Sequence, residues 1–224
     1  MAILRSSIMT LLTLAYLLRP LGVGYSQVGK LYPVDEAARD ASLFILRARL
    51  LEAVQQRDTA LILSSLSPDI FNSFGGNSGI AKFKEEWKPD QPNSKLWPTL
   101  ATVLALGGSF QNEKTFTAPY TYSRFPDKLD AFEHGVIVGE NVRVRQMATP
   151  DSPVVTSLSF DVVEVTDWGA KSTEGGKQEW VRVKLASGQQ GYIASAYVRS
   201  PLDYRIVFEK RQGRWLITTL VAGD

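Results

Sequence analysis

The chain contains no cysteine and only one histidine, His134, among its 224 residues. Without cysteine it has no disulfide, no thiolate metal site and no cysteine nucleophile. A single histidine also excludes metal sites built from several imidazoles. The apolar core must therefore hold the fold unaided, and we expect no metal and no other cofactor.

An excess of charge of one sign is also lacking. The chain carries 25 lysines and arginines against 23 aspartates and glutamates. Residues 1–26 include two of the arginines and no acid, which leaves 23 basic and 23 acidic side chains in the remainder. A balanced surface has no long-range field to attract nucleic acid or an anionic membrane. We therefore expect no nucleic-acid partner.

Residues 1–26 have the pattern of a secretory signal peptide. Arg5 gives a positive start, residues 8–18 are almost wholly apolar, and Gly24-Tyr25-Ser26 places small residues where a signal peptidase reads. The apolar stretch is shorter than the roughly 20 residues that a membrane-spanning helix needs. We expect cleavage after Ser26 and export to the periplasm or cell envelope. The alternative is an uncleaved anchor, which would be the chain's only contact with a membrane.

Residues 27–133 are predicted to form a mainly helical domain. Asp35 is the predicted cap of a first helix whose apolar side chains recur at three- and four-residue spacing. These side chains are Leu43, Leu46, Leu50 and Val54. Further helices are expected after Asp58, Ser67-Pro68, Ser78 and Ser94. Residues 111–133 are rich in aromatic residues and proline, so we expect an ordered connection that packs on the helices.

From Gly135 onward the apolar period changes from helical spacing to two. Valines alternate with charged or polar residues in three runs, at 142–145, 163–165 and 181–184. Turn signals separate the runs at Thr149-Pro150-Asp151, Ser187-Gly188 and Gln212-Gly213. Residues 167–179 contain three glycines and are expected to form an exposed loop. This arrangement is typical of a small β-barrel.

The order of these motifs resembles that of bacterial SH3 domains. That family opens with a Leu-Asn-Val-Arg-like strand, where this chain has Val142-Arg143-Val144-Arg145. A Trp-Tyr-Lys-Val-like strand corresponds to Trp180-Val181-Arg182-Val183, and the following turn corresponds to Ser187-Gly188-Gln189-Gln190-Gly191-Tyr192-Ile193. The family's short helical turn and last strand correspond to Ala194-Ser195-Ala196-Tyr197-Val198. Arg143 replaces the family's asparagine, and the loop before Trp180 is longer than usual.

The resemblance implies a barrel over residues 134–201 that binds peptide or cell-wall material. Because SH3-type barrels bind across aromatic-lined grooves, the candidate ligand site consists of the aromatic and basic side chains of this segment. The candidates are Trp168, Trp180, Tyr192, Tyr197, Arg143 and Arg182. Trp168 and Tyr197 are the predicted walls of the site.

Residues 202–224 read as a C-terminal β-hairpin around Lys210-Arg211-Gln212-Gly213. Its Gly-Arg-Trp-x-Ile strand is similar to the last strands of small cone-shaped α+β proteins of the nuclear-transport-factor-two type. The hairpin therefore packs either on the barrel or back on the helical domain, in which case the barrel is an insertion. The predicted fold class is α+β, with an N-terminal helical layer, a small SH3-type β-barrel and this hairpin.

Three candidate catalytic groups were weighed. His134 beside Glu133 suggests acid–base chemistry, but such a histidine is far more often structural. Glu85 and Glu86 point roughly 100° apart on a helix and so do not face one sugar ring. The glycine-rich turn between Ser73 and Ser78 lacks a nucleophile-elbow pattern. We predict no catalytic residue.

The sequence thus predicts an exported, non-enzymatic binding or scaffold protein of the cell envelope. Its partner would be peptide or peptidoglycan, or another envelope protein. One alternative is a cell-wall hydrolase that uses carboxylates of the helical domain, which requires two acids about 5–10 Å apart in one cleft. The other is a structural subunit of an envelope complex.

Overall fold

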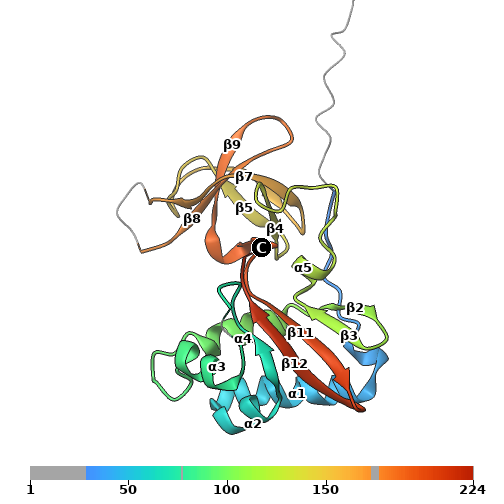
Figure 1. Cartoon of the computed structure of the whole chain (residues 1–224). Helices are drawn as coiled ribbons and strands as arrows, with labels where there is room; N and C mark the ends of the chain where they lie inside the picture. Colours follow the sequence, from blue (N-terminus) through green and yellow to red (C-terminus); the bar gives the residue numbers. More distant parts are fainter. Residues whose placement is uncertain (1–28, 77, 173–176, 224) are drawn as a thin grey trace, which may run out of the picture.

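A computed structural model describes residues 29–76, 78–172 and 177–223, so the predicted signal peptide lies outside the described residues. Helices and strands are divided between two regions, each with its own sheet (Figure 1). We call residues 36–123 with 204–223 the helix-covered region, and residues 134–199 the curled sheet. Among the described residues, no helix combines the length and apolar character that crossing a membrane requires.

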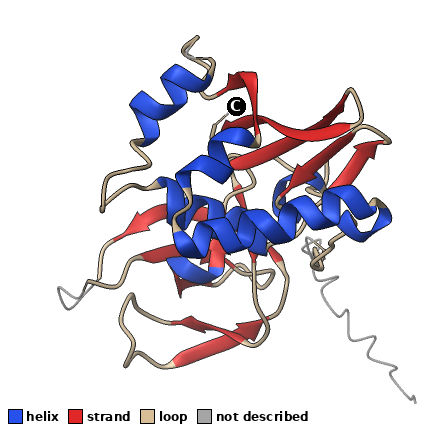
Figure 2. Ribbon diagram, turned by 90° about the horizontal axis from the view of Figure 1, so that it is seen from below, coloured by secondary structure: helices blue, strands red, loops and turns tan. Residues whose placement is uncertain are grey.

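The helix-covered region combines most of the helices with a five-stranded sheet. Its helices are η1 (Ala37–Arg39), α1 (Ala41–Gln56), α2 (Thr59–Ser64), α3 (Ile80–Trp87), α4 (Leu96–Ala105) and α5 (Tyr120–Ser123). Its strands are β1 (Leu66–Phe71), β2 (Ser109–Asn112), β3 (Thr115–Ala118), β11 (Arg205–Arg211) and β12 (Arg214–Val221). The spatial order is β1-β12-β11-β3-β2. Seen from below, the long helix α1 crosses in front of the strands (Figure 2).

Helix α1 begins at Asp40. The Asp40 carboxylate accepts hydrogen bonds from the backbone N–H groups of Ser42 (2.9 Å) and Leu43 (3.1 Å), two donors that a helix start leaves unpaired. The predicted cap, Asp35, is wrong for this helix. Its carboxylate instead accepts from the N–H of Ala37, in the turn before α1.

Other helix boundaries agree with the local signals. The Asp58 carboxylate accepts from the N–H of Leu61 (2.9 Å) at the start of α2, and the Ser94 hydroxyl accepts from the N–H of Leu96 (3.2 Å) at the start of α4. Helix α3 ends at Trp87, as predicted from the proline that follows two residues later. The cap Asp58 and the end of α3 are confirmed, whereas the N-cap of α4 is Lys95 and not the predicted Ser94.

The helix expected after Ser67-Pro68 is wrong, because residues 66–71 form β1 and pair in parallel with β12. Pro68 is tolerated because β1 is an edge strand, where a missing N–H breaks no ladder bond. Residues 109–112 and 115–118 form β2 and β3, where the sequence predicted an ordered connection from residue 111 and no strand. Pairing with distant strands outweighed the local signals in both places.

The C-terminal hairpin belongs to the helix-covered region. Strand β11 pairs with both β3 and β12, so the hairpin lies in the middle of the five-stranded sheet. Ile206, Phe208 and Ile217 on this hairpin are at most 1% exposed and join the core beneath the helices. The sequence left two positions open for the hairpin, and these contacts decide between them. The curled sheet is consequently inserted between α5 and β11.

The curled sheet has seven strands in the order β10-β4-β7-β8-β9-β5-β6. They are β4 (His134–Ile137), β5 (Val142–Arg145), β6 (Val154–Leu158), β7 (Val162–Ala170), β8 (Trp180–Lys184), β9 (Gln190–Ala194) and β10 (Val198–Arg199), with η2 (Ser195–Tyr197) before β10. Val198 and Leu158, from the two terminal strands of this order, pack on the same apolar cluster. The sheet therefore curls around one core. An exposed loop was expected at 167–179, but β7 continues to Ala170, and residues 173–176 lie outside the described residues.

Residues 29–36 connect the two regions. Leu31 N–H donates to the carbonyl of Phe160 in the curled sheet (2.7 Å), and Gly108 N–H donates to the carbonyl of Val34 beside β2 (2.9 Å). A separate buried cluster lies between the regions and consists of Tyr120, Val136 and Val162. The connection is thus made by backbone hydrogen bonds and by apolar packing.

Candidate functional site

Three of the predicted ligand-binding residues line one groove on the curled sheet. Its volume is about 320 Å³. Its principal lining residues are Glu140, Asn141, Arg143, Arg145, Trp180 and Tyr197. We call this the groove. The segments that contribute Arg143, Trp180 and Tyr197 are separated in sequence and meet only because the sheet curls.

The strand alternation aims Arg143 outward. Val142 and Val144 are 6% and 0% exposed in the core, so the intervening Arg143 faces solvent on the opposite side of β5. Arg145 also lies on this outer side, and its guanidinium donates to the carbonyl of Ser152 (2.6 Å). The groove therefore has one fixed arginine and one exposed arginine. Arg145 was not among the predicted site residues. Its alternation with the buried Val144 is the sequence feature that places it on the same outer face as Arg143.

Trp180 and Tyr197 supply two different kinds of aromatic surface. Trp180 begins β8 and is 3% exposed, packed with Ala148 and Ala170. Its indole Nε1 is buried and has no hydrogen-bond acceptor among the described residues. Tyr197 ends η2 and is 52% exposed, so its ring is available to a ligand.

The remaining three predicted residues lie outside the groove. Trp168 is 38% exposed and lines a different hollow, and a Cβ placed on Gly135 would lie 2.9 Å from its ring. Tyr192 is half-buried against the Trp180 cluster. Arg182 is paired in register with Tyr192 on the outer face of β8, and its Nε is buried without a partner. The structure therefore brings together half of the predicted set.

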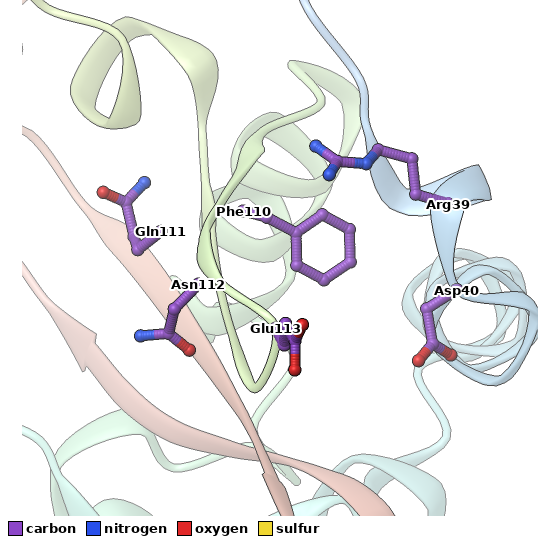
Figure 3. Close-up of a pocket in the computed structure, with 6 residues that line it drawn as sticks. All are labelled: Arg39, Asp40, Phe110, Gln111, Asn112 and Glu113. Carbon is purple, nitrogen blue, oxygen red and sulfur yellow. The ribbon is translucent and has the colours of Figure 1, made fainter.

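A second hollow, of about 450 Å³, lies beside β2 in the helix-covered region. Figure 3 shows the ring of Phe110 between Arg39 and Glu113, with Asp40 on the opposite wall. The Arg39 guanidinium lies 5.3 Å from the centre of the Phe110 ring. We call this the β2 hollow. It contains two carboxylates, which is the minimum that a carboxylate hydrolase requires.

Asp40 in the β2 hollow already has structural partners. The Lys210 ammonium donates to its carboxylate (2.7 Å), and the same carboxylate caps α1. The hydrogen bond from Lys210, followed by that from Ser42, holds the pKa of Asp40 well below its usual range. Asp40 therefore stays ionised at any physiological pH and cannot donate a proton. Among the described residues, Glu113 is the other acid that lines this hollow.

The other catalytic candidates occupy structural or surface positions. His134 Nδ1 donates to the carbonyl of Asp130 (2.8 Å). Glu85 is exposed and pairs with Lys82 (2.7 Å), one turn away on the same helix. The Ser73 hydroxyl accepts from the N–H of Gly75 (3.1 Å), inside the glycine-rich turn. None of these contacts brings the groups into the groove or the β2 hollow.

Within residues 29–76, 78–172 and 177–223, no group of three or more histidine, aspartate or glutamate side chains is placed to hold a metal ion. Comparisons of the chain with protein-family models, with curated proteins and with solved structures find no match. The groove and the β2 hollow are therefore the features from which a function can be inferred.

Proposed function

We propose that this chain is an exported binding protein of the cell envelope and that its curled sheet is an SH3-type barrel holding a peptide in the groove. The observation that carries the proposal is that Arg143, Trp180 and Tyr197 all line the groove. Aromatic walls with a few convergent polar groups are the usual composition of a peptide-binding groove. Export is supported by the signal pattern of residues 1–26.

The groove's side chains favour a ligand that carries a carboxylate. Arg143 presents a planar set of donors that matches a carboxylate in two parallel hydrogen bonds. The exposed ring of Tyr197 offers apolar contact area, and Trp180 lines the same groove. Peptides of peptidoglycan combine free carboxylates with short apolar side chains. They are therefore the ligand class that we propose.

The first test is retention of the purified chain, without residues 1–26, on insoluble peptidoglycan. Tyr197→Ala and Arg143→Ala are each expected to reduce retention about tenfold, which corresponds to about 1.4 kcal/mol of binding free energy. Matched controls lie on the outer face of α1. They are Phe44→Ala, which removes an aromatic ring that is 55% exposed, and Arg49→Ala, which removes an exposed guanidinium.

The controls decide how the test is interpreted. Equal loss in Phe44→Ala and Tyr197→Ala would mean that any exposed ring promotes adsorption, and the groove would carry no binding. Unchanged retention in both groove variants would also contradict the proposal. Isothermal titration with soluble wall peptides then locates the recognised part of the ligand.

A carboxylate hydrolase is the second candidate, because the β2 hollow contains Asp40 and Glu113. With Asp40 held ionised, Glu113 would have to serve as the general acid. Release of soluble sugar or peptide in the retention assay, abolished in Glu113→Gln, would establish this activity. Our proposal of a non-enzymatic protein predicts no release from either form.

A further inference from the structure

Among the described residues, the two sheets have four terminal strands, β1, β2, β6 and β10, and three of these edges are blocked. Strand β10 has only two residues. Strand β1 includes Pro68 and Asp69. The edge of strand β2 is covered by the segment before η1. The N–H of Phe110 donates to the Glu36 carboxylate (3.0 Å), and the backbone of residues 34–36 forms hydrogen bonds with Gly108, next to β2. Short length, proline, charge and covering segments are the usual protections of an edge strand.

Strand β6 has none of these protections apart from one irregularity in its pairing with β5. Its sequence, Val-Val-Thr-Ser-Leu, contains no charge, proline or glycine. In an antiparallel pair, alternate residues direct their N–H and C=O groups away from the partner strand. Among the described residues, no strand pairs with that outer edge. Val154, at its start, is 48% exposed.

We propose that the outer edge of β6 binds an extended segment of another protein as an added strand, with apolar and acidic residues alternating along it. Strand addition satisfies the free backbone groups, and the flanking side chains decide which segment fits. Thr156 and Leu158 pair with Val144 and Val142, whose side chains lie in the core, so the inward residues of the added strand meet an apolar edge.

The outward residues of the added strand meet positive charge. Ser157 and Val154 pair with Arg143 and Arg145 on β5. An added strand would lie roughly 5 Å beyond β6 and about 10 Å from β5, a separation that long acidic and basic side chains span together. Acidic residues at the outward positions would therefore be attracted. A second copy of this chain fits less well, because antiparallel pairing of two β6 strands would bring a second Arg143 and Arg145 with only one groove acid among the described residues, Glu140, between them.

The test measures amide hydrogen exchange at residues 154–158 of the full chain by NMR. The probe is the peptide acetyl-Val-Glu-Val-Glu-Val-Glu-amide. We expect saturating peptide to slow the outward amides of β6 at least tenfold. The same peptide with alternate N-methyl groups is expected to give no protection, because it cannot complete the backbone ladder. A lysine analogue, acetyl-Val-Lys-Val-Lys-Val-Lys-amide, is expected to bind at least tenfold more weakly.

Two substitutions at the exposed Ser157 distinguish the effect of side-chain charge on peptide binding from the effect of side-chain size. Ser157→Glu places an acid opposite Arg143, which favours the fold and repels the acidic peptide, so protection should be lost. Ser157→Gln has nearly the same size without the charge and should keep the protection. Equal protection in both variants would overturn the assignment of an acidic partner.

Other results also contradict the proposal. Slowed exchange confined to groove residues would assign the peptide to the groove. Concentration-dependent protection of β6 without peptide would assign the edge to a second copy of this chain. Because the measurement is local to residues 154–158, a failure of the groove to bind peptidoglycan would leave this test unaffected.

Discussion

The two regions of the molecule assemble their cores from the chain in different ways. The curled sheet is formed by one continuous stretch, residues 134–199, whereas the helix-covered region joins residues 36–123 to the hairpin at 204–223. The first region therefore depends mainly on neighbouring segments. The second region depends on a hairpin that follows the whole curled sheet in the sequence.

The side chains of the two cores differ accordingly. The main buried cluster of the curled sheet consists of β-branched residues, seven valines and two isoleucines, and a smaller one surrounds Trp180. The core of the helix-covered region includes Phe83, Phe116, Phe208, Trp87, Trp97 and Trp215 together with many leucines. β-branched residues suit a curled sheet whose strands supply nearly all of its packing. Large side chains are needed where helices must fill the distance to a sheet.

The candidate sites differ in the same way. The groove presents exposed arginine and tyrosine on strand and turn positions, and most of its charge is unpaired by acids. In the β2 hollow, Asp40 pairs with Lys210 and Arg39 pairs with Glu36. Charges that already have intramolecular partners are less available to a ligand. The comparison therefore favours the curled sheet as the binding region and the helix-covered region as its support.

Among the substitutions that test this difference between the regions, Phe208→Ala should have the largest effect on stability. Phe208 on β11 is 0% exposed and stacks edge-on with Phe116 across the sheet. The cavity should lower the free energy of unfolding by about 3–5 kcal/mol. Phe44→Ala, on the exposed side of α1, is the control and should change it by less than about 0.5 kcal/mol.

Hydrogen exchange of the same Phe208→Ala protein tests whether the regions are separate folding units. We expect faster exchange in β1, β3 and β12, with unchanged protection in β7 and β8. Equal loss of protection in both sheets would show that the molecule unfolds as one unit, and the contrast between the regions would then be structural only.

Asp40→Asn should have an intermediate effect that depends on pH. The substitution keeps a capping oxygen and removes the charge that Lys210 stabilises, so we expect a loss on the order of 1 kcal/mol at pH 7. Because the pKa of Asp40 is lowered by folding, its ionised form contributes stability above the unfolded-state pKa of about 3.9. That contribution is lost as the pH falls below this value.

Denaturant titrations of wild type and Asp40→Asn at pH 7 and at pH 2–3 measure this difference. The difference in stability between the two proteins should shrink towards pH 2–3 and should vanish only at a still lower pH, where the native carboxylate is protonated as well. A difference that stays constant over this range would mean that the charge of Asp40 contributes nothing and that only its cap matters.

Lys30→Ala should have the smallest effect and concerns the junction between the regions. Lys30 pairs with Asp161 (2.9 Å), and its side chain is 39% exposed. An exposed pair of this kind contributes about 0–1 kcal/mol. We expect little change in global stability, with faster amide exchange at Leu31 and Val162. A loss above about 2 kcal/mol would show that the curled sheet depends on its connection to residues 29–36.

Short-range features of the fold were predictable from the sequence. The cap Asp58, the end of α3 and the alternation at Val142 to Arg145 are set by side chains within a few residues of one another. Of the groove, the sequence predicted the outward direction of Arg143, because Arg143 alternates with buried valines on β5. Strand alternation did not reveal that Trp168 lies on β7 beside a different hollow, and its role in ligand binding stays a prediction.

By itself, the sequence determined the absence of thiol chemistry, the balanced charge, the positions of most helices and the change to strand periodicity after Gly135. All of these depend on composition or on neighbours along the chain. Tertiary structure decided that residues 66–71 are a strand, that the last hairpin completes the helix-covered sheet, and that Arg143, Trp180 and Tyr197 share one groove. The physical reason is that strand pairing and groove formation join residues far apart in sequence, and their free energy exceeds the small local preferences of segments such as Ser67-Pro68.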